Sequence, residues 1–190
     1  MTASTPAAKR GLSTGAIVAI VAGGVAMVLV VVAGVIGFVL IRNTMRFTVP
    51  GASMEPTIRA GQTVSATKVD AGKYRPRRGD IVVFTAPAAW TTKSGEMFVK
   101  RVIGLPGERV ACCDPKGSLY IDTTPLAEPY LKAGATPGRT SFDIKVPDGR
   151  LWVMGDNRAQ SGDSLLSFMN SRDINLATIS VSSVSAIVKP

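Results

Sequence analysis

The sequence predicts a mainly β protein, in which an antiparallel β-sheet domain follows one N-terminal transmembrane helix. Two observations lead to this fold class. Residues 16–41 carry no charged or polar side chain, and the chain after them breaks into short apolar runs between turn-forming residues. Only a short stretch near residues 163–170 has the spacing of an amphipathic helix. The roughly 150 residues after the apolar segment are enough for one domain with a buried core.

Residues 15–41 are expected to form an uncleaved membrane anchor. As a helix, residues 16–41 span about 39 Å, which is enough to cross a hydrocarbon core with some tilt, whereas a cleavable signal peptide has an apolar core of only about 7–15 residues. Two basic residues flank the segment on each side, so counting charges does not decide its orientation. Because long domains translocate largely regardless of charge, we expect residues 1–14 to be a cytoplasmic tail and residues 42–190 to be extracytoplasmic.

Nine short runs after the anchor are expected to form strands, because each is bounded by Gly, Pro, Asp or Asn. The stretch from about 111 to 146 is richer in Pro, Gly and Thr, which predicts an inserted β subregion between two strands of the main domain. The expected strands are 46–50, 62–69, 79–87, 96–104, 109–113, 117–122, 141–147, 151–156 and 179–188.

The composition excludes several classes of function. The chain has a formal net charge of +9, but its Lys and Arg residues are scattered and only 6% of its residues are aromatic, so we expect anionic phospholipid rather than nucleic acid as the partner of this charge. The chain contains no histidine, which excludes Ser-His-Asp and Cys-His catalysis.

The two cysteines, Cys112 and Cys113, are adjacent, a spacing that fits no metal site, and we expect neither a metal nor another cofactor. Two small buried hydrophobes are favoured over a vicinal disulfide, which stays possible outside the cytoplasm.

Residues 49–58, VPGASMEPTI, present Ser53 between a Gly-Ala turn and a Met-Glu-Pro-Thr run. A nucleophilic serine needs a base, and without histidine the remaining candidate is a neutral lysine. A lysine that works near pH 8 needs a pKa lowered by about 2–3 units, which burial among apolar groups can supply. Ser53 taken alone is better explained as an ordinary turn residue before Pro56.

Lys100 is the lysine whose surroundings fit this requirement. In EMFVKRVIG, strand alternation places Phe98, Lys100 and Val102 on one face and Arg101 on the other. The strand taken alone also allows an edge-strand lysine that blocks aggregation.

Four blocks of the sequence resemble, in order, those of the bacterial type I signal peptidases, or leader peptidases, which are membrane-anchored proteases with a Ser-Lys dyad. The resemblance implies the signal peptidase/LexA-like fold, with Ser53 as the nucleophile and Lys100 as the general base. It also implies that Ser161 orients the lysine amine, and that Asp163, Arg101 and Asp156 support the site. We expect Asp163 to pair with Arg101. The blocks are SMEPT at 53–57, RGDIVVF at 78–84, KRVIGLPGE at 100–108 and GDNRAQSGDS at 155–164.

The sequence departs from the family pattern at two positions. Leu165 stands where the family usually has arginine, and Arg172 is a candidate replacement. Gly51 stands where some members have a serine that helps to bind the oxyanion. The oxyanion hole is therefore expected to use the backbone N–H of Ser53, near the Gly51 position, together with a second donor that the sequence does not identify.

The resemblance implies removal of N-terminal signal peptides from exported preproteins, after Ala-x-Ala-like sites, at the outer face of the cell membrane. The expected partners are signal peptides and the lipid bilayer. A self-cleaving repressor-type Ser-Lys protease would need a DNA-binding domain where this chain has its apolar segment. A catalytically silent, membrane-anchored β-domain that binds peptides stays open as the alternative.

Overall fold

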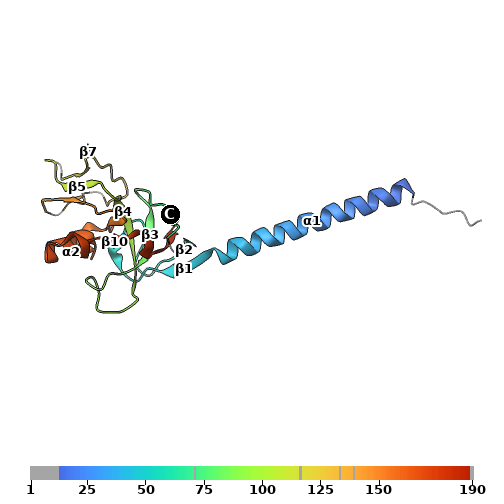
Figure 1. The fold of residues 1–190 in the computed structure, drawn as a ribbon, viewed down its shortest axis with the longest axis horizontal. Coiled ribbons are helices and arrows are strands. Elements are labelled where there is room, and N and C mark those ends of the chain that lie inside the picture. The colour runs from blue at the N-terminus through green and yellow to red at the C-terminus, as the bar shows by residue number, and fades with distance from the viewer. Residues whose placement is uncertain (1–12, 71, 116, 133, 139, 189–190) are drawn as a thin grey trace, which may run out of the picture. The chain divides into compact units, whose positions relative to one another are not determined.

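The computed structural model describes residues 13–70, 72–115, 117–132, 134–138 and 140–188 (Figure 1). The chain divides into two compact units, Met1–Asn43 and Thr44–Pro190, and each is described by itself. The first twelve residues of the predicted cytoplasmic tail lie outside the described residues.

The first unit contains one helix, α1, which runs from Thr14 to Arg42. At its end, the guanidinium of Arg42 lies over the ring of Phe38 at 4.6 Å from the centroid. Counting only the residues that the structure describes, no helix is both long and apolar enough to span a membrane.

The second unit is mainly antiparallel β-sheet, as the sequence predicts. Its larger sheet has seven strands in the order β1-β2-β11-β3-β4-β9-β10, and its smaller sheet has four strands in the order β7-β6-β5-β8. Strands β5 and β7 and helix α2 lie on the side of this unit away from β1 and β2 (Figure 1). The strands of the larger sheet are β1 (Thr44–Thr48), β2 (Thr63–Lys68), β3 (Ile81–Thr85), β4 (Met97–Gly104), β9 (Arg150–Met154), β10 (Ile179–Ser180) and β11 (Val184–Val188). The strands of the smaller sheet are β5 (Arg109–Cys112), β6 (Leu119–Ile121), β7 (Thr124–Pro125) and β8 (Phe142–Lys145).

The helices of this unit are short. They are η1 (Ala52–Met54), η2 (Arg158–Gln160), α2 (Ser164–Ser171), α3 (Ile174–Ala177) and η3 (Val181–Ser183). Helix α2 confirms the helical spacing near 163–170.

The prediction of a single strand over 179–188 is wrong, because η3 divides it into β10 and β11. The Ser180 hydroxyl accepts the N–H of Ser182 at 3.2 Å, and the Ser183 hydroxyl donates to the Ser180 carbonyl at 2.7 Å. These serine side chains thus form local hydrogen bonds with backbone groups that would otherwise pair with a neighbouring strand. As a result, β10 pairs with β9 while β11 lies between β2 and β3.

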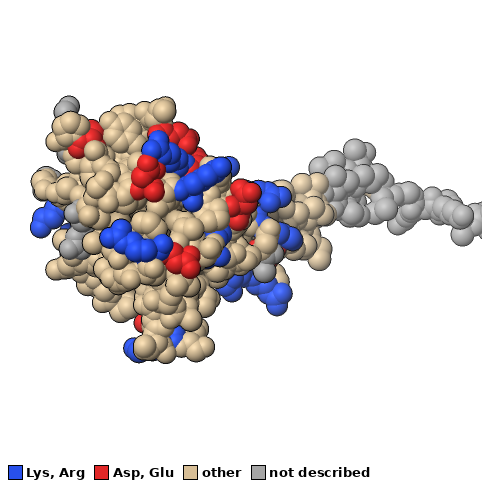
Figure 2. All heavy atoms as spheres, turned by 60° about the vertical axis from the view of Figure 1, so that its left-hand side comes forward, with Lys and Arg blue, Asp and Glu red and all other residues tan. Residues whose placement is uncertain are grey.

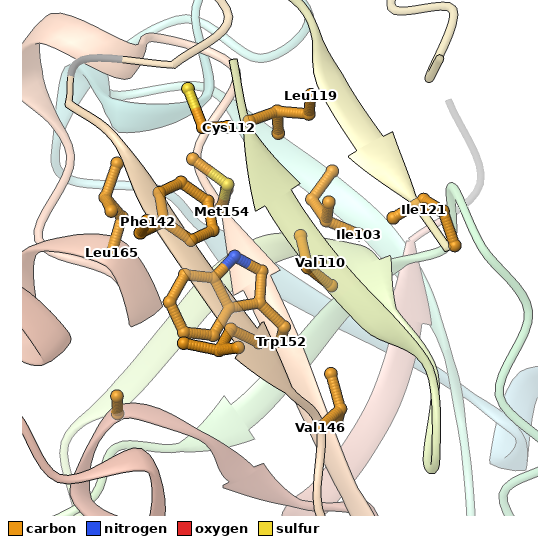
Figure 3. Close-up of a cluster of buried hydrophobic side chains, with 12 residues drawn as sticks. Ile103, Val110, Cys112, Leu119, Ile121, Phe142, Val146, Trp152, Met154 and Leu165 are labelled. Carbon is orange, nitrogen blue, oxygen red and sulfur yellow. The ribbon is translucent and has the colours of Figure 1, made fainter. Parts of the chain in front are cut away.

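A core cluster around Trp152 joins the two sheets (Figure 3). The Phe142 ring stacks on Trp152 with centroids 5.3 Å apart, and Leu165 enters the same cluster from α2. A Cβ atom at Gly104, the last residue of β4, would come to 3.1 Å from Trp152 and 2.9 Å from Val146. The close packing of the smaller sheet against β4 therefore requires glycine at this position.

Strand β4 positions the candidate site because it lies between β3 and β9, with Lys100 opposite Val82 and Arg101 opposite Met154. Phe98 and Val102 belong to one buried cluster and Val99 to another. The predicted alternation of β4 is confirmed, and it sends Lys100 and Arg101 to opposite faces.

Charged side chains of both signs are interspersed on the face of the protein shown in Figure 2. Lys and Arg do not merge there into one continuous basic surface. On this face, positive and negative side chains are therefore mixed.

Candidate active site

Ser53 lies in the short helix η1, and both ends of that turn are fixed. The Met54 side chain is fully buried, and its carbonyl accepts the N–H of Ile58 at 2.9 Å. From the other side of the site, Asn157 donates its backbone N–H to the Ser53 carbonyl at 2.9 Å and its side-chain Nδ2 to the Ala52 carbonyl at 3.1 Å. The turn therefore holds Ser53 in one place relative to β4 and to the loop after β9.

Lys100 reaches Ser53 from β4. Its Nζ donates a hydrogen bond to Ser53 Oγ at 2.8 Å, and its side chain is only 4% exposed. The Phe98 ring lies on the same side, with its centroid 5.3 Å from Nζ. Burial lowers the pKa of Lys100 to about 8, although the Asp163 and Asp156 carboxylates act in the opposite direction. About a tenth of the amine is thus neutral at pH 7 and about half at pH 8, so that it can act as a general base.

Arg101, the next residue of β4, forms a buried two-pronged ion pair with Asp156. Arg101 Nε donates to Oδ1 at 2.8 Å and Nη2 to Oδ2 at 2.7 Å. Nη1 donates to the Gly79 carbonyl at 2.8 Å, and the Thr57 hydroxyl donates to Asp156 Oδ2 at 2.5 Å. The guanidinium also lies 4.0 Å from the centroid of the Tyr130 ring. This pair ties β4 to the loop that follows β9.

The prediction that Asp163 pairs with Arg101 is wrong. Asp163 instead caps the N-terminus of α2, where its carboxylate accepts the N–H groups of Leu165 at 3.1 Å and Leu166 at 3.4 Å. It also accepts the N–H of Gly155 at 3.0 Å. An aspartate at the N-cap accepts hydrogen bonds from backbone N–H groups that the helix itself leaves unpaired. Asp163 makes these local bonds and does not pair with Arg101, which lies on the other face of β4.

The loss of the usual family arginine has a structural explanation at Leu165. This side chain is 3% exposed and packs in the core cluster around Trp152, so an apolar contact occupies the position. The expectation that Arg172 replaces the arginine is wrong, since Arg172 ends α2 in the left-handed conformation (φ 57°), at the opposite end of the helix from Asp163.

Ser161 is buried close to the site, but its hydroxyl has no hydrogen-bond partner among the described residues. The bond to Lys100 that the resemblance implies is thus not formed here, and the role of Ser161 stays a prediction. A Cβ atom at Gly155 would collide with both Ser161 Oγ and the Ser53 carbonyl oxygen. Glycine at 155 allows the loop to pass between them.

The expected oxyanion hole has one candidate donor in place. Within the part of the chain that the structure describes, the Ser53 N–H donates no hydrogen bond. A Cβ atom at Gly51 would meet nothing within 4 Å, so the space beside this position is open. The second donor stays unidentified.

Cys112 and Cys113 are joined by a disulfide, so the expectation of two small buried hydrophobes is wrong. Cys112 is buried at the end of β5, whereas Cys113 is exposed. Gly138 packs against the pair so closely that a Cβ atom there would collide with Cys112 Sγ. Among the described residues, no group of three or more His, Cys, Asp or Glu side chains could hold a metal ion.

Sequence reasoning missed the buried ion pair between Glu128 and Arg158. Arg158 Nε also donates to the Gly155 carbonyl at 3.0 Å, so the pair connects the segment after β7 to the loop after β9. Arg158 lies within the GDNRAQSGDS block, but no pattern in the Pro- and Gly-rich stretch around Glu128 identifies it as the partner.

Comparisons with known proteins agree with the blocks found in the sequence. The profile of the family described as "Signal peptidase, peptidase S26" matches residues 21–180. The chain is 32% identical over 178 residues to signal peptidase I of Mycobacterium tuberculosis, covering 72% of this chain and 60% of that protein. It is 39% identical over 119 residues to probable signal peptidase I-1 of Synechocystis sp., covering 61% of this chain and 59% of that protein.

The chain spans a little more than half of the length of these curated relatives. A crystal structure of a signal peptidase I from Enterococcus faecalis aligns with a TM-score of 0.46 and 27% identity, covering 61% of this chain and 98% of that chain.

Proposed function

Since the chain belongs to the signal peptidase family, peptidase S26, we propose that it is a membrane-anchored serine endopeptidase that removes N-terminal signal peptides from exported preproteins. One observation carries the catalytic part of this proposal. A serine hydroxyl on a fixed turn lies 2.8 Å from the amine of a buried lysine whose pKa is lowered to about 8. Nucleophile and base within hydrogen-bond reach are the geometric signature of activated-serine catalysis.

In the proposed reaction, neutral Lys100 takes the proton of Ser53 as Oγ attacks the carbonyl carbon at the end of the signal peptide. The Ser53 N–H stabilises the oxyanion that forms. The protonated Lys100 then gives its proton to the leaving amine, which departs as the new N-terminus of the mature protein. A water, deprotonated by the neutral lysine, hydrolyses the acyl-enzyme and restores Ser53.

The supporting residues have distinct proposed tasks. The Arg101–Asp156 pair holds β4 against the loop after β9, and Asp163 holds that loop to α2 through Gly155. Ser161 lies buried beside the same loop, where it is proposed to orient the lysine amine. These residues act on Lys100 and Ser53 by fixing the positions of the segments that carry them.

The proposal includes attachment to the cell membrane through residues 15–41. The absence of any charged or polar side chain over residues 16–41 supports it. The tail at 1–14 would then lie in the cytoplasm and the β-sheet unit outside, near anionic phospholipid. This arrangement would bring Ser53 within reach of signal peptides that emerge from the membrane.

The lowered pKa of Lys100 predicts how cleavage depends on pH. Because only the neutral amine accepts a proton, kcat/KM is expected to rise about tenfold per pH unit below pH 7 and to level off above about pH 9, with an apparent pKa near 8. At pH 6 about 1% of the lysine is neutral, so the rate there should be about 100-fold below the plateau. Cleavage of a synthetic signal-peptide substrate between pH 5 and 10 measures this profile. A rate that stays flat from pH 5 to 9 would reject Lys100 as the base.

The proposed function is tested with the full chain in detergent and a preprotein whose signal peptide ends in Ala-x-Ala. The wild type is expected to release the mature protein with its N-terminus directly after this site, and Ser53→Ala to release none. Ser94→Ala, at an exposed serine far from the turn in sequence, is the matched control and should retain full activity. Binding of the preprotein without cleavage by the wild type would favour the catalytically silent peptide-binding domain instead.

A further inference from the structure

A polar cleft adjoins the turn that carries Ser53 and takes no part in the Ser53–Lys100 contact. Its volume is about 880 Å³, and its walls are residues around 55–59, Lys132 with residues 134–136, and the loop at 156–160. Pockets that hold small-molecule ligands measure about 300–1,000 Å³. The cleft is thus large enough to hold several residues of an extended peptide.

The cleft lies next to the turn of the candidate active site. Glu55 and Pro56, which line it, follow Ser53 by two and three residues. Asn157, which also lines it, donates hydrogen bonds to the carbonyls of Ser53 and Ala52 at 2.9 and 3.1 Å. Asn157 thus belongs both to the wall of the cleft and to the contacts that hold the Ser53 turn.

The charges of the cleft do not cancel. Two of its five charged residues are already neutralised, since Asp156 pairs with Arg101 and Arg158 pairs with Glu128. The Glu55 carboxylate accepts the N–H of Ala60 at 3.2 Å.

The remaining two, Arg59 and Lys132, form no ion pair with a carboxylate among the described residues. The cleft thus presents two available cations against the single carboxylate of Glu55.

We propose that this cleft binds the first residues of the mature protein, on the C-terminal side of the cleaved bond, and that Arg59 and Lys132 favour an acidic side chain there. The residues before the cut are small and apolar and need shallow apolar pockets, whereas the side chains of Arg59, Lys132 and Asn157 are among those that line this cleft. The mature side has no such requirement, and an acidic residue there gains attraction from both cations. This inference rests on the proposed function and adds a preference for the residues on the mature side of the cleavage site.

The test uses three peptides that are identical through the Ala-x-Ala site and carry Asp, Asn or Lys at the third mature position. With the full chain in detergent at low salt, kcat/KM is expected to be about five- to tenfold higher for the Asp peptide than for the Lys peptide. The double variant Arg59→Gln/Lys132→Gln should reduce this ratio to about one. Arg59→Glu should invert the ratio, and Lys145→Gln, at an exposed position of β8, should leave it unchanged.

Equal ratios in the wild type and the double variant would overturn the inference. So would a variant that slows all three peptides equally, because that result indicates a structural role for Arg59 or Lys132.

If the wild type cleaves none of the peptides, the proposed function fails, and fluorescence anisotropy of the same labelled peptides with Ser53→Ala decides the inference separately. Tighter binding of the Asp peptide that the double variant loses supports the cleft, and equal binding of all three rejects it.

Discussion

Replacing Lys100 with methionine is expected to lower kcat for signal-peptide cleavage by about 10⁴-fold or more, because loss of the base leaves Ser53 with no group to take its proton. Methionine suits the site, since the lysine side chain is 4% exposed and its Nζ lies 5.3 Å from the centroid of the Phe98 ring. The substitution should therefore remove the amine without leaving a cavity.

Two measurements and a control variant distinguish loss of the base from loss of the fold. Single-turnover cleavage gives the rate, and thermal unfolding of the full chain in detergent gives the stability, which should not fall, because the methionine carries no charge to desolvate. Lys68→Met, at an exposed position on β2, is the matched control and should keep wild-type activity. Retention of more than a few per cent of activity by a folded Lys100→Met protein would contradict the assignment.

Replacing Arg101 with methionine is expected to destabilise the β-sheet unit by about 3–5 kcal/mol, because it leaves the carboxylate of Asp156 buried without its partner. The Asp156 side chain is 0% exposed and that of Arg101 is 9% exposed. For a unit of this size the loss corresponds to a fall in Tm of roughly 10 °C.

A double variant tests whether the cost arises from the unpaired charge. Arg101→Met with Asp156→Asn removes both charges and should recover part of the lost Tm, measured by tryptophan fluorescence on heating. Lys73→Ala is the control, since it breaks the Asp70–Lys73 pair, whose side chains are 78% and 77% exposed. Exposed pairs contribute about 0–1 kcal/mol, so its Tm should hardly change. Equal losses in the single and double variants would assign the effect to packing instead of charge.

The sequence predicted the elements that depend on local patterns. The alternation around Lys100 gave the correct faces of β4, and burial of that residue followed from Phe98 and Val102 beside it. The bounding Gly, Pro, Asp and Asn residues located most strands to within a few positions. These signals are local, because period-two alternation and turn chemistry act over a few residues.

The errors lie where a residue had several possible partners. Arg101 had two nearby acids in the last block, and spacing alone could not show that Asp163 would cap α2 while Asp156 turns toward β4. Glu128 and Arg158 are 30 residues apart in the sequence. The periodic patterns that indicate helices and strands cover only a few residues, so they could not predict this pair. In the terminal run, hydroxyl groups around Ser180 and Ser183 ended a strand that β propensity alone would have continued.

The position of β11 has a consequence for when the proposed enzyme can first act. This strand, the last of the sheet in chain order, lies between β2, which follows the Ser53 turn, and β3, which leads into β4 and Lys100. During synthesis the segments that carry Ser53 and Lys100 are made long before residues 184–188. Until then, β2 and β3 lack the strand that pairs with both of them. Pairing over such separations forms late in folding. Assembly of the sheet, and with it the proposed proteolytic activity, would thus wait until residues 184–188 have been made.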